Sequence, residues 1–247
     1  MTPSESRERR PTGEPGEATW RGPLIAALVT TAVATALSYG VPAEHAATAV
    51  GLAFLGATYW LALRDDDPEA ARRYGLSLGG LLDREPLDVP ALVRSAVTEL
   101  GFALAVAAVV FPPFWVAYKL WWSPVRDFHP ALLRGVADEA LGQFLVIALP
   151  EEAFYRGFLQ TRLDEVWRPR WRVLGAWLGP GVVATSLVFA LGHVATETHP
   201  DRLAVFFPSL LFGWIRTRRG GIGAAAAFHA LCNLFASYLA RSYGLGL

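Results

Sequence analysis

The sequence reads FLVIALPEEAFYRGFLQ from residue 144 to residue 160, an apolar run interrupted by Glu151, Glu152 and Arg156. A charge at bilayer depth costs at least about 2.5 kcal/mol, so ionisable residues inside an apolar helix are functional candidates. Because Glu152 and Arg156 are four residues apart, they share a helix face and can pair, while Glu151 points about 100° away. The pattern indicates a membrane helix in which Arg156 neutralises one glutamate and the other is free to act. A buried ion pair that only holds helices together is the alternative.

The composition of the whole chain is that of a membrane protein. Its 247 residues are 53% hydrophobic and only 18% charged, and the apolar residues occur in long runs. The 22 basic residues balance the 22 acidic ones, which argues against a nucleic-acid partner that needs a basic face. The single cysteine, Cys232, excludes an intramolecular disulfide framework and a cysteine-based metal cluster. The sequence therefore predicts no cofactor and no metal.

Apolar runs of roughly 20 residues predict membrane-spanning helices. We expect an all-α fold, a polytopic membrane bundle of seven helices, or of eight if Pro112 and Pro113 break the third segment. The seven segments are Pro23 to Tyr39, Ala46 to Leu63, Ser95 to Tyr118, Val136 to Gln160, Val173 to His193, Leu203 to Ile215 and Ile222 to Leu239.

The remaining segments suggest how the chain is organised. Residues 1–20 are polar and rich in proline, glycine and charge, which predicts a disordered tail and not a signal peptide. Residues 21–92 form a helical hairpin followed by a charged loop, from residue 64 to residue 90, whose apolar middle could lie along the membrane interface. Residues 93–247 form the predicted core.

Arginine placement predicts the orientation, because cytoplasmic loops are enriched in basic residues. Four clusters fall on the tail and on alternate loops, so seven helices with the N-terminus inside fit all of them. Lys119, Arg126 and Arg134 on one outer loop weaken the pattern. The clusters are Arg7, Arg9, Arg10 and Arg21; Arg64, Arg72, Arg73 and Arg84; Arg162, Arg168, Arg170 and Arg172; and Arg216, Arg218 and Arg219.

Two further apolar segments carry polar residues. FALGH places His193 at the end of a predicted helix, where a capping role is the alternative to a catalytic one. HALCN places His229 and Asn233 four residues apart on one helix face, where interhelical hydrogen bonding is the alternative. If the hairpin turns near residues 168–172, Glu151 and His193 lie at comparable distances of about 25 to 35 Å from its apex, so they can meet. Glu99 is a further buried charge, without a motif around it.

Together these groups could hydrolyse a peptide bond inside a membrane. The reaction needs a base to activate water and donors for the tetrahedral oxyanion. Our hypothesis is that Glu151 takes the proton with the help of His193, while His229 and Asn233 stabilise the oxyanion. Glu152 and Arg156 support them as an ion pair.

The three motifs, EEAFYR, FALGH and HALCN in this order, resemble those of the CAAX-protease and bacteriocin-processing family of intramembrane glutamate endopeptidases, also called the Abi family. The resemblance covers about residues 136 to 240. It implies that Glu151 is the catalytic base, that Glu152 and Arg156 are its accompanying pair, and that His193, His229 and Asn233 are the other motif residues. It also implies a membrane-anchored protein or peptide as substrate. Bacteriocin maturation, self-immunity or the C-terminal sorting of the myxosortase-like branch are the expected bacterial roles, in the inner (plasma) membrane.

Three other readings stay open from the sequence. A zinc peptidase could use two histidines and a glutamate as ligands, although no H-E-x-x-H occurs. A non-catalytic membrane protein, such as an immunity protein, could bind a peptide without cutting it. A transporter is disfavoured because no internal repeat is seen.

Overall fold

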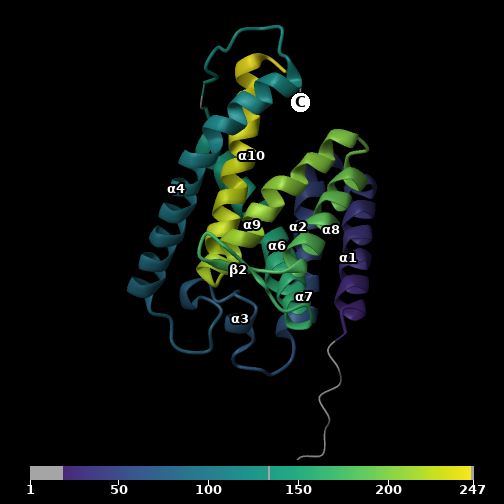
Figure 1. The fold of residues 1–247 in the computed structure, drawn as a ribbon, viewed down its shortest axis with the longest axis vertical. Coiled ribbons are helices and arrows are strands. Elements are labelled where there is room, and N and C mark those ends of the chain that lie inside the picture. The colour runs from purple at the N-terminus through teal and green to yellow at the C-terminus, as the bar shows by residue number, and fades with distance from the viewer. Residues whose placement is uncertain (1–18, 133, 246–247) are drawn as a thin grey trace, which may run out of the picture.

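The computed structural model describes residues 19–132 and 134–245, and these form a bundle of apolar helices with one small β-hairpin (Figure 1). The predicted all-α membrane bundle is confirmed. The predicted disordered tail lies outside the described residues except for Thr19 and Trp20. The main helices are α1 (Arg21–Gly40), α2 (Ala43–Thr58), α4 (Val89–Trp122), α5 (Val136–Gly142), α6 (Leu149–Glu152), α7 (Thr161–Val166), α8 (Pro180–Thr196), α9 (Phe206–Arg219) and α10 (Gly223–Tyr243).

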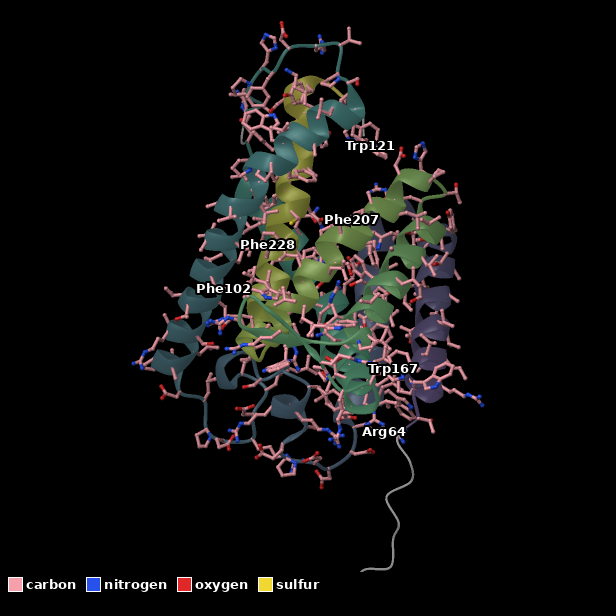
Figure 2. The ribbon with its side chains drawn as sticks, in the orientation of Figure 1. Arg64, Phe102, Trp121, Trp167, Phe207 and Phe228 are labelled. Carbon is pink, nitrogen blue, oxygen red and sulfur yellow. The ribbon has the colours of Figure 1, made fainter. Side chains whose placement is uncertain are left out.

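All seven predicted helical segments are present in the described part of the chain, and successive segments run in opposite directions. Four are long and apolar enough to cross a membrane by length and composition: Arg21–Gly40, Ala43–Leu63, Val89–Trp122 and Gly223–Tyr243. The loops that carry arginine clusters gather at the lower end of Figure 1, where Figure 2 labels Arg64. We call this end, with the 64–88 loop, the 167–179 hairpin and the α9–α10 turn, the arginine-rich end.

The third segment stays one helix across its two prolines. α4 continues through Pro112 and Pro113 to Trp122, so the break required for an eighth helix does not occur. A proline removes one backbone hydrogen bond, but packing against a neighbouring helix can hold the chain helical. Here α10 packs along α4, and the ring of Phe111 lies parallel to that of Phe235 at 4.3 Å.

The fifth segment begins later than the sequence predicts. Residues Trp171–Val173 (β1) and Ala176–Leu178 (β2) form an antiparallel hairpin, and α8 starts only at Pro180. Leu174 and Gly175, at the turn, both have positive φ angles, which match the twist of a two-residue hairpin. Proline suits the first position of a helix, because its missing N–H would have no partner there. The prediction that this helix begins at Val173 was therefore wrong. The sixth segment, by contrast, is longer than predicted: a 3₁₀ turn, Pro200–Val205, leads into α9, which continues to Arg219.

The fourth segment contains two π-helical stretches, Gln143–Ala148 and Ala153–Gln160, on either side of α6. The four residues of α6, with both glutamates, therefore lie between two wider turns. Such turns are rare in proteins as a whole, but those that occur are often found at functional sites.

The loop between α2 and α4 folds back onto the core at the arginine-rich end. Tyr74 and Leu76 are buried, and the backbone N–H of Ile222 donates to the carbonyl of Gly75 at 3.0 Å. Gly157 permits the close approach of Leu76, because a Cβ at this position would lie 2.7 Å from Leu76 Cδ2. The first part of the apolar middle thus packs on protein, whereas Leu81 and Leu82 are about half exposed. The division of the chain at residue 92 stays a prediction.

Glu99, which has no motif around it, has a structural partner. Its carboxylate accepts hydrogen bonds from Arg219 Nη2 at 2.6 Å and from the backbone N–H of Ala224 at 3.1 Å. Ala224 lies in the first turn of α10, whose N–H groups have no partner within the helix. Glu99 therefore joins the ends of α9 and α10 to α4, and it caps the helix that carries His229.

We expect Glu99→Ala to destabilise the fold by about 1–3 kcal/mol, because it removes a helix cap and leaves Arg219 without its partner. The measurement is the midpoint of thermal unfolding of the purified protein in detergent. Glu69→Ala is the control, since it breaks an exposed pair with Arg72 and should change the midpoint little. Equal midpoints for the two variants would contradict the capping role.

Candidate active site

The polar centre of the bundle is formed by side chains from three helical segments. Glu151 and Glu152 lie on α6, Arg156 follows on the adjoining π-helical stretch, and His229 comes from α10. Ser209 of α9 completes the group. The fold thus brings together residues that are far apart in the sequence: Glu151 and His229 are separated by 78 positions.

Arg156 and Glu152 form an ion pair with no exposure to solvent. Arg156 Nη1 donates to Glu152 Oε1 at 2.8 Å, and both side chains are 0% exposed. Arg156 Nη2 donates to Ser209 Oγ at 2.5 Å and to the carbonyl of Ser209 at 3.2 Å. The rings of Phe189 and Phe212 lie 4.5 and 5.1 Å from the guanidinium carbon. The pairing that the four-residue spacing predicts is therefore formed, and it fastens two helices together.

His229 contacts both glutamates. Its Nδ1 lies 3.0 Å from Glu152 Oε1, and its Nε2 lies 3.8 Å from Glu151 Oε2. An ionised carboxylate only accepts hydrogen bonds, so Nδ1 carries the proton and donates to Glu152. The imidazole also stacks on Phe212, with ring centroids 4.7 Å apart and planes 17° apart. These contacts fix the ring with Nε2 directed toward Glu151.

Glu151 is held less tightly than Glu152. Its side chain is 13% exposed, and its Oε2 is buried without a hydrogen-bond partner among the described residues. The cluster holds two carboxylates against one guanidinium. The guanidinium bonds to Glu152, so Glu151 has no cation of its own at this distance among the described residues. The two neighbouring glutamates thus have different environments.

Asn233 and His193 lie further from the carboxylates. Asn233 follows His229 by one turn, and its Nδ2 donates to Gln143 Oε1 at 2.9 Å. His193 lies in the last turn of α8, with Nδ1 3.0 Å from the carbonyl of Phe189. No hydrogen bond or ion pair connects His193 to Glu151 in the part of the chain that the structure describes.

His193 and Glu151 nevertheless lie at the same level of the bundle. The rings of Phe189 and Tyr155 are in contact, with centroids 5.1 Å apart, on antiparallel helices. Glu151 comes one turn before Tyr155, and His193 comes one turn after Phe189, so both residues lie one turn beyond this contact. The expected meeting of the two segments occurs through these aromatic rings and not through a direct bond.

Gln143 and Ser209 are site residues that the sequence analysis did not single out. Gln143 is the only polar residue between Glu139 and Glu151, which is a usable signal. Ser209 gives no such signal, because a serine in an apolar helix is common and only the fold places it against Arg156.

In residues 19–132 and 134–245, no group of three or more His, Cys, Asp or Glu side chains has the arrangement that would hold a metal ion.

Comparison with known proteins supports a peptidase. Residues 135–235 match the family described as "Type II CAAX prenyl endopeptidase Rce1-like", a range that contains all three motifs. The match confirms the resemblance seen in the sequence. It supports, in general terms, the activity of an intramembrane endopeptidase. Searches of curated proteins and of solved structures gave no match to the chain.

We expect Arg156→Met to destabilise the protein by about 3–5 kcal/mol, because it leaves the Glu152 charge buried without a partner. Thermal unfolding in detergent measures the loss. The double variant Glu152→Gln with Arg156→Met should recover part of it, since no unpaired charge remains. Arg241→Met, which breaks a partly exposed pair with Glu139, is the control and should cost at most about 1 kcal/mol. If Arg156→Met unfolds at the wild-type temperature, the ion pair does not stabilise the bundle.

Proposed function

Because residues 135–235 match the type II CAAX prenyl endopeptidase family, we propose that this chain is a glutamic intramembrane endopeptidase in which Glu151 is the general base. One observation supports this role above the others. Of the two adjacent glutamates, Glu152 accepts hydrogen bonds from Arg156 and His229, whereas the Glu151 carboxylate accepts none from the described residues and its Oε2 lies 3.8 Å from His229 Nε2.

In the proposed reaction, Glu151 takes a proton from a water molecule while the water oxygen attacks the carbonyl carbon of the scissile bond. The carbonyl oxygen becomes an oxyanion, which His229 Nε2–H and the second N–H of Asn233 stabilise. The C–N bond then breaks, and protonated Glu151, assisted by His193, returns the proton to the leaving amine. The second proton of the water stays on the new carboxyl group, so the products are a carboxylic acid and an amine, which exchange this proton to give a carboxylate and an ammonium group, and the enzyme is regenerated.

Glu152 and Arg156 are positioning residues in this proposal. Glu152 accepts the hydrogen bond from His229 Nδ1, which holds the imidazole ring with Nε2 directed toward the reacting atoms. Arg156 holds Glu152 in place through an ion pair shielded from solvent. Gln143 is also a positioning residue, because its Oε1 accepts a hydrogen bond from Asn233 Nδ2 and so orients the Asn233 amide.

The proposed substrate is a membrane-anchored protein or peptide, and the proposed location is the bacterial plasma membrane. The apolar surface of the bundle supports a lipid environment, since large residues such as Val109 and Leu120 are about three-quarters exposed. Processing or sorting of protein C-termini and bacteriocin maturation are the proposed bacterial roles. A non-catalytic binding or immunity protein is the second candidate, because motif residues can persist in a protein that only binds.

We expect Glu151→Gln to lower hydrolysis by about 10²–10⁴-fold, since it removes the base while keeping the shape of the side chain. The measurement is mass spectrometry of protein C-termini in membranes of the native host, comparing the wild type with a chromosomal variant. Glu139→Gln is the matched control, a glutamate on the same helical segment that pairs with Arg241 and should leave processing intact. Unchanged C-termini in the Glu151→Gln strain, with the protein expressed, would favour the non-catalytic candidate.

We expect the purified enzyme to keep its full activity after treatment with a zinc chelator, because the proposed base and oxyanion donors are side chains. The assay is cleavage of a substrate identified from the C-terminal comparison, with a known zinc peptidase as the positive control for chelation. A loss of activity that added Zn²⁺ restores would support a zinc-dependent membrane peptidase instead.

A further inference from the structure

A line of polar side chains runs from the site to the arginine-rich end. Glu152, Arg156, Gln160 and Asp164 follow one another at every fourth position, so they lie along one side of the fourth helical segment. The facing side of α9 presents Ser209, Gly213 and Thr217 with the same spacing. We call these seven residues the polar seam.

The two sides of the polar seam are in direct contact. Arg156 Nη2 donates to Ser209 Oγ at 2.5 Å. One turn further, Gln160 Nε2 donates to Thr217 Oγ1 at 3.0 Å and to the carbonyl of Gly213 at 3.3 Å. Gln160 is only 2% exposed, so the seam lies inside the bundle and not on its surface.

These contacts leave several polar atoms of the polar seam without partners. Within the described residues, the buried atoms Glu152 Oε2, Arg156 Nε, Gln160 Oε1 and Asp164 Oδ1 accept or donate no hydrogen bond. Buried polar atoms in native proteins are ordinarily bonded to protein or to ordered water. A seam that only fastened two helices would pair these atoms with one another. Their regular spacing along one line therefore indicates water molecules as their partners.

The polar seam opens into a polar cavity at the arginine-rich end. The cavity has a volume of about 300 Å³, and it is lined by Gln160, Thr161, Asp164, Glu165, Arg216 and Thr217. This volume is enough for several water molecules. Arg216 Nε, which is also buried without a partner among the described residues, belongs to the same lining. The cavity thus connects the last polar pair of the seam with the end of the bundle.

Gly213 allows close packing in the middle of the polar seam. A Cβ at this position would lie 3.0 Å from Gln160 Oε1, one of the atoms without a partner, and 2.8 Å from Val182 Cγ1. A larger residue would therefore push against Gln160 Oε1 and Val182, so the position of the Gln160 side chain depends on this glycine.

We propose that a file of water molecules enters through the cavity between α7 and α9 and follows the polar seam to Glu152 and Glu151, where it supplies the water consumed in hydrolysis. The existence of the water file is independent of the proposed function, and only its use in hydrolysis rests on it.

The first test is radiolytic hydroxyl labelling of the wild-type protein in detergent, read by mass spectrometry. Water activated inside a protein labels the side chains beside it. Phe189 and Phe212, which flank the Arg156 guanidinium, are 1% and 2% exposed, and Phe154 is 0% exposed but lies away from the polar seam. We expect severalfold faster oxidation of Phe189 and Phe212 than of Phe154. Equal, low rates for all three rings would overturn the proposal.

The second test fills the polar seam without removing a polar group. We expect Gly213→Ala to abolish the excess labelling of Phe212 and to lower kcat about tenfold with KM unchanged, because the added methyl crowds Gln160 Oε1, to which the file of water molecules would bond. Gly157→Ala is the matched control: its Cβ meets Leu76 Cδ2 at 2.7 Å, a similar crowding away from the seam. Equal effects of the two variants on labelling would overturn the proposal.

The two readouts separate this proposal from the proposed function. If Gly213→Ala abolishes the excess labelling but the wild-type protein cleaves no substrate, the proposed file of water molecules stands and the proposed peptidase function is rejected. Activity without excess labelling would keep the peptidase and reject the water file along the polar seam.

Discussion

The ion pair between Arg156 and Glu152 is the interaction on which the centre of the bundle depends. Removing two charges from water is expensive, and their attraction compensates only when the geometry is good and further hydrogen bonds are made. Both conditions hold here, because Arg156 also reaches Ser209 and Glu152 also accepts from His229. The pair therefore ties the fourth segment to α9 and to α10.

The position of this pair follows from how the surrounding helices are held. Two π-helical stretches flank α6, and they set the direction of both glutamates. Glu99 fixes the start of α10 through its bonds to Arg219 and to the N–H of Ala224, so it determines the level at which His229 enters the site. Glu99, which lies outside the candidate site, thus contributes to the position of His229 within it.

The contrast between the two glutamates connects the structure to the proposed function. Neighbouring residues on a helix point in directions about 100° apart, so Glu152 meets the arginine while Glu151 does not. His229 lies between them and contacts each through a different ring nitrogen. One carboxylate can therefore fix the imidazole while the other handles the proton, a division that a single acidic residue could not provide. The same side of the helix continues as the polar seam, which gives water a route to both.

The sequence by itself determined the membrane bundle, the seven helical segments and the pairing of Glu152 with Arg156, because apolar run length and helical periodicity are local properties. It also placed His229 and Asn233 on one face of α10. Only the tertiary structure decided that His229 contacts both glutamates, that the segments of Glu151 and His193 meet through Tyr155 and Phe189, and that α8 starts after a β-hairpin. Such contacts depend on how helices far apart in the sequence pack, and on π-helical turns, and neither is encoded in the spacing of residues along one segment.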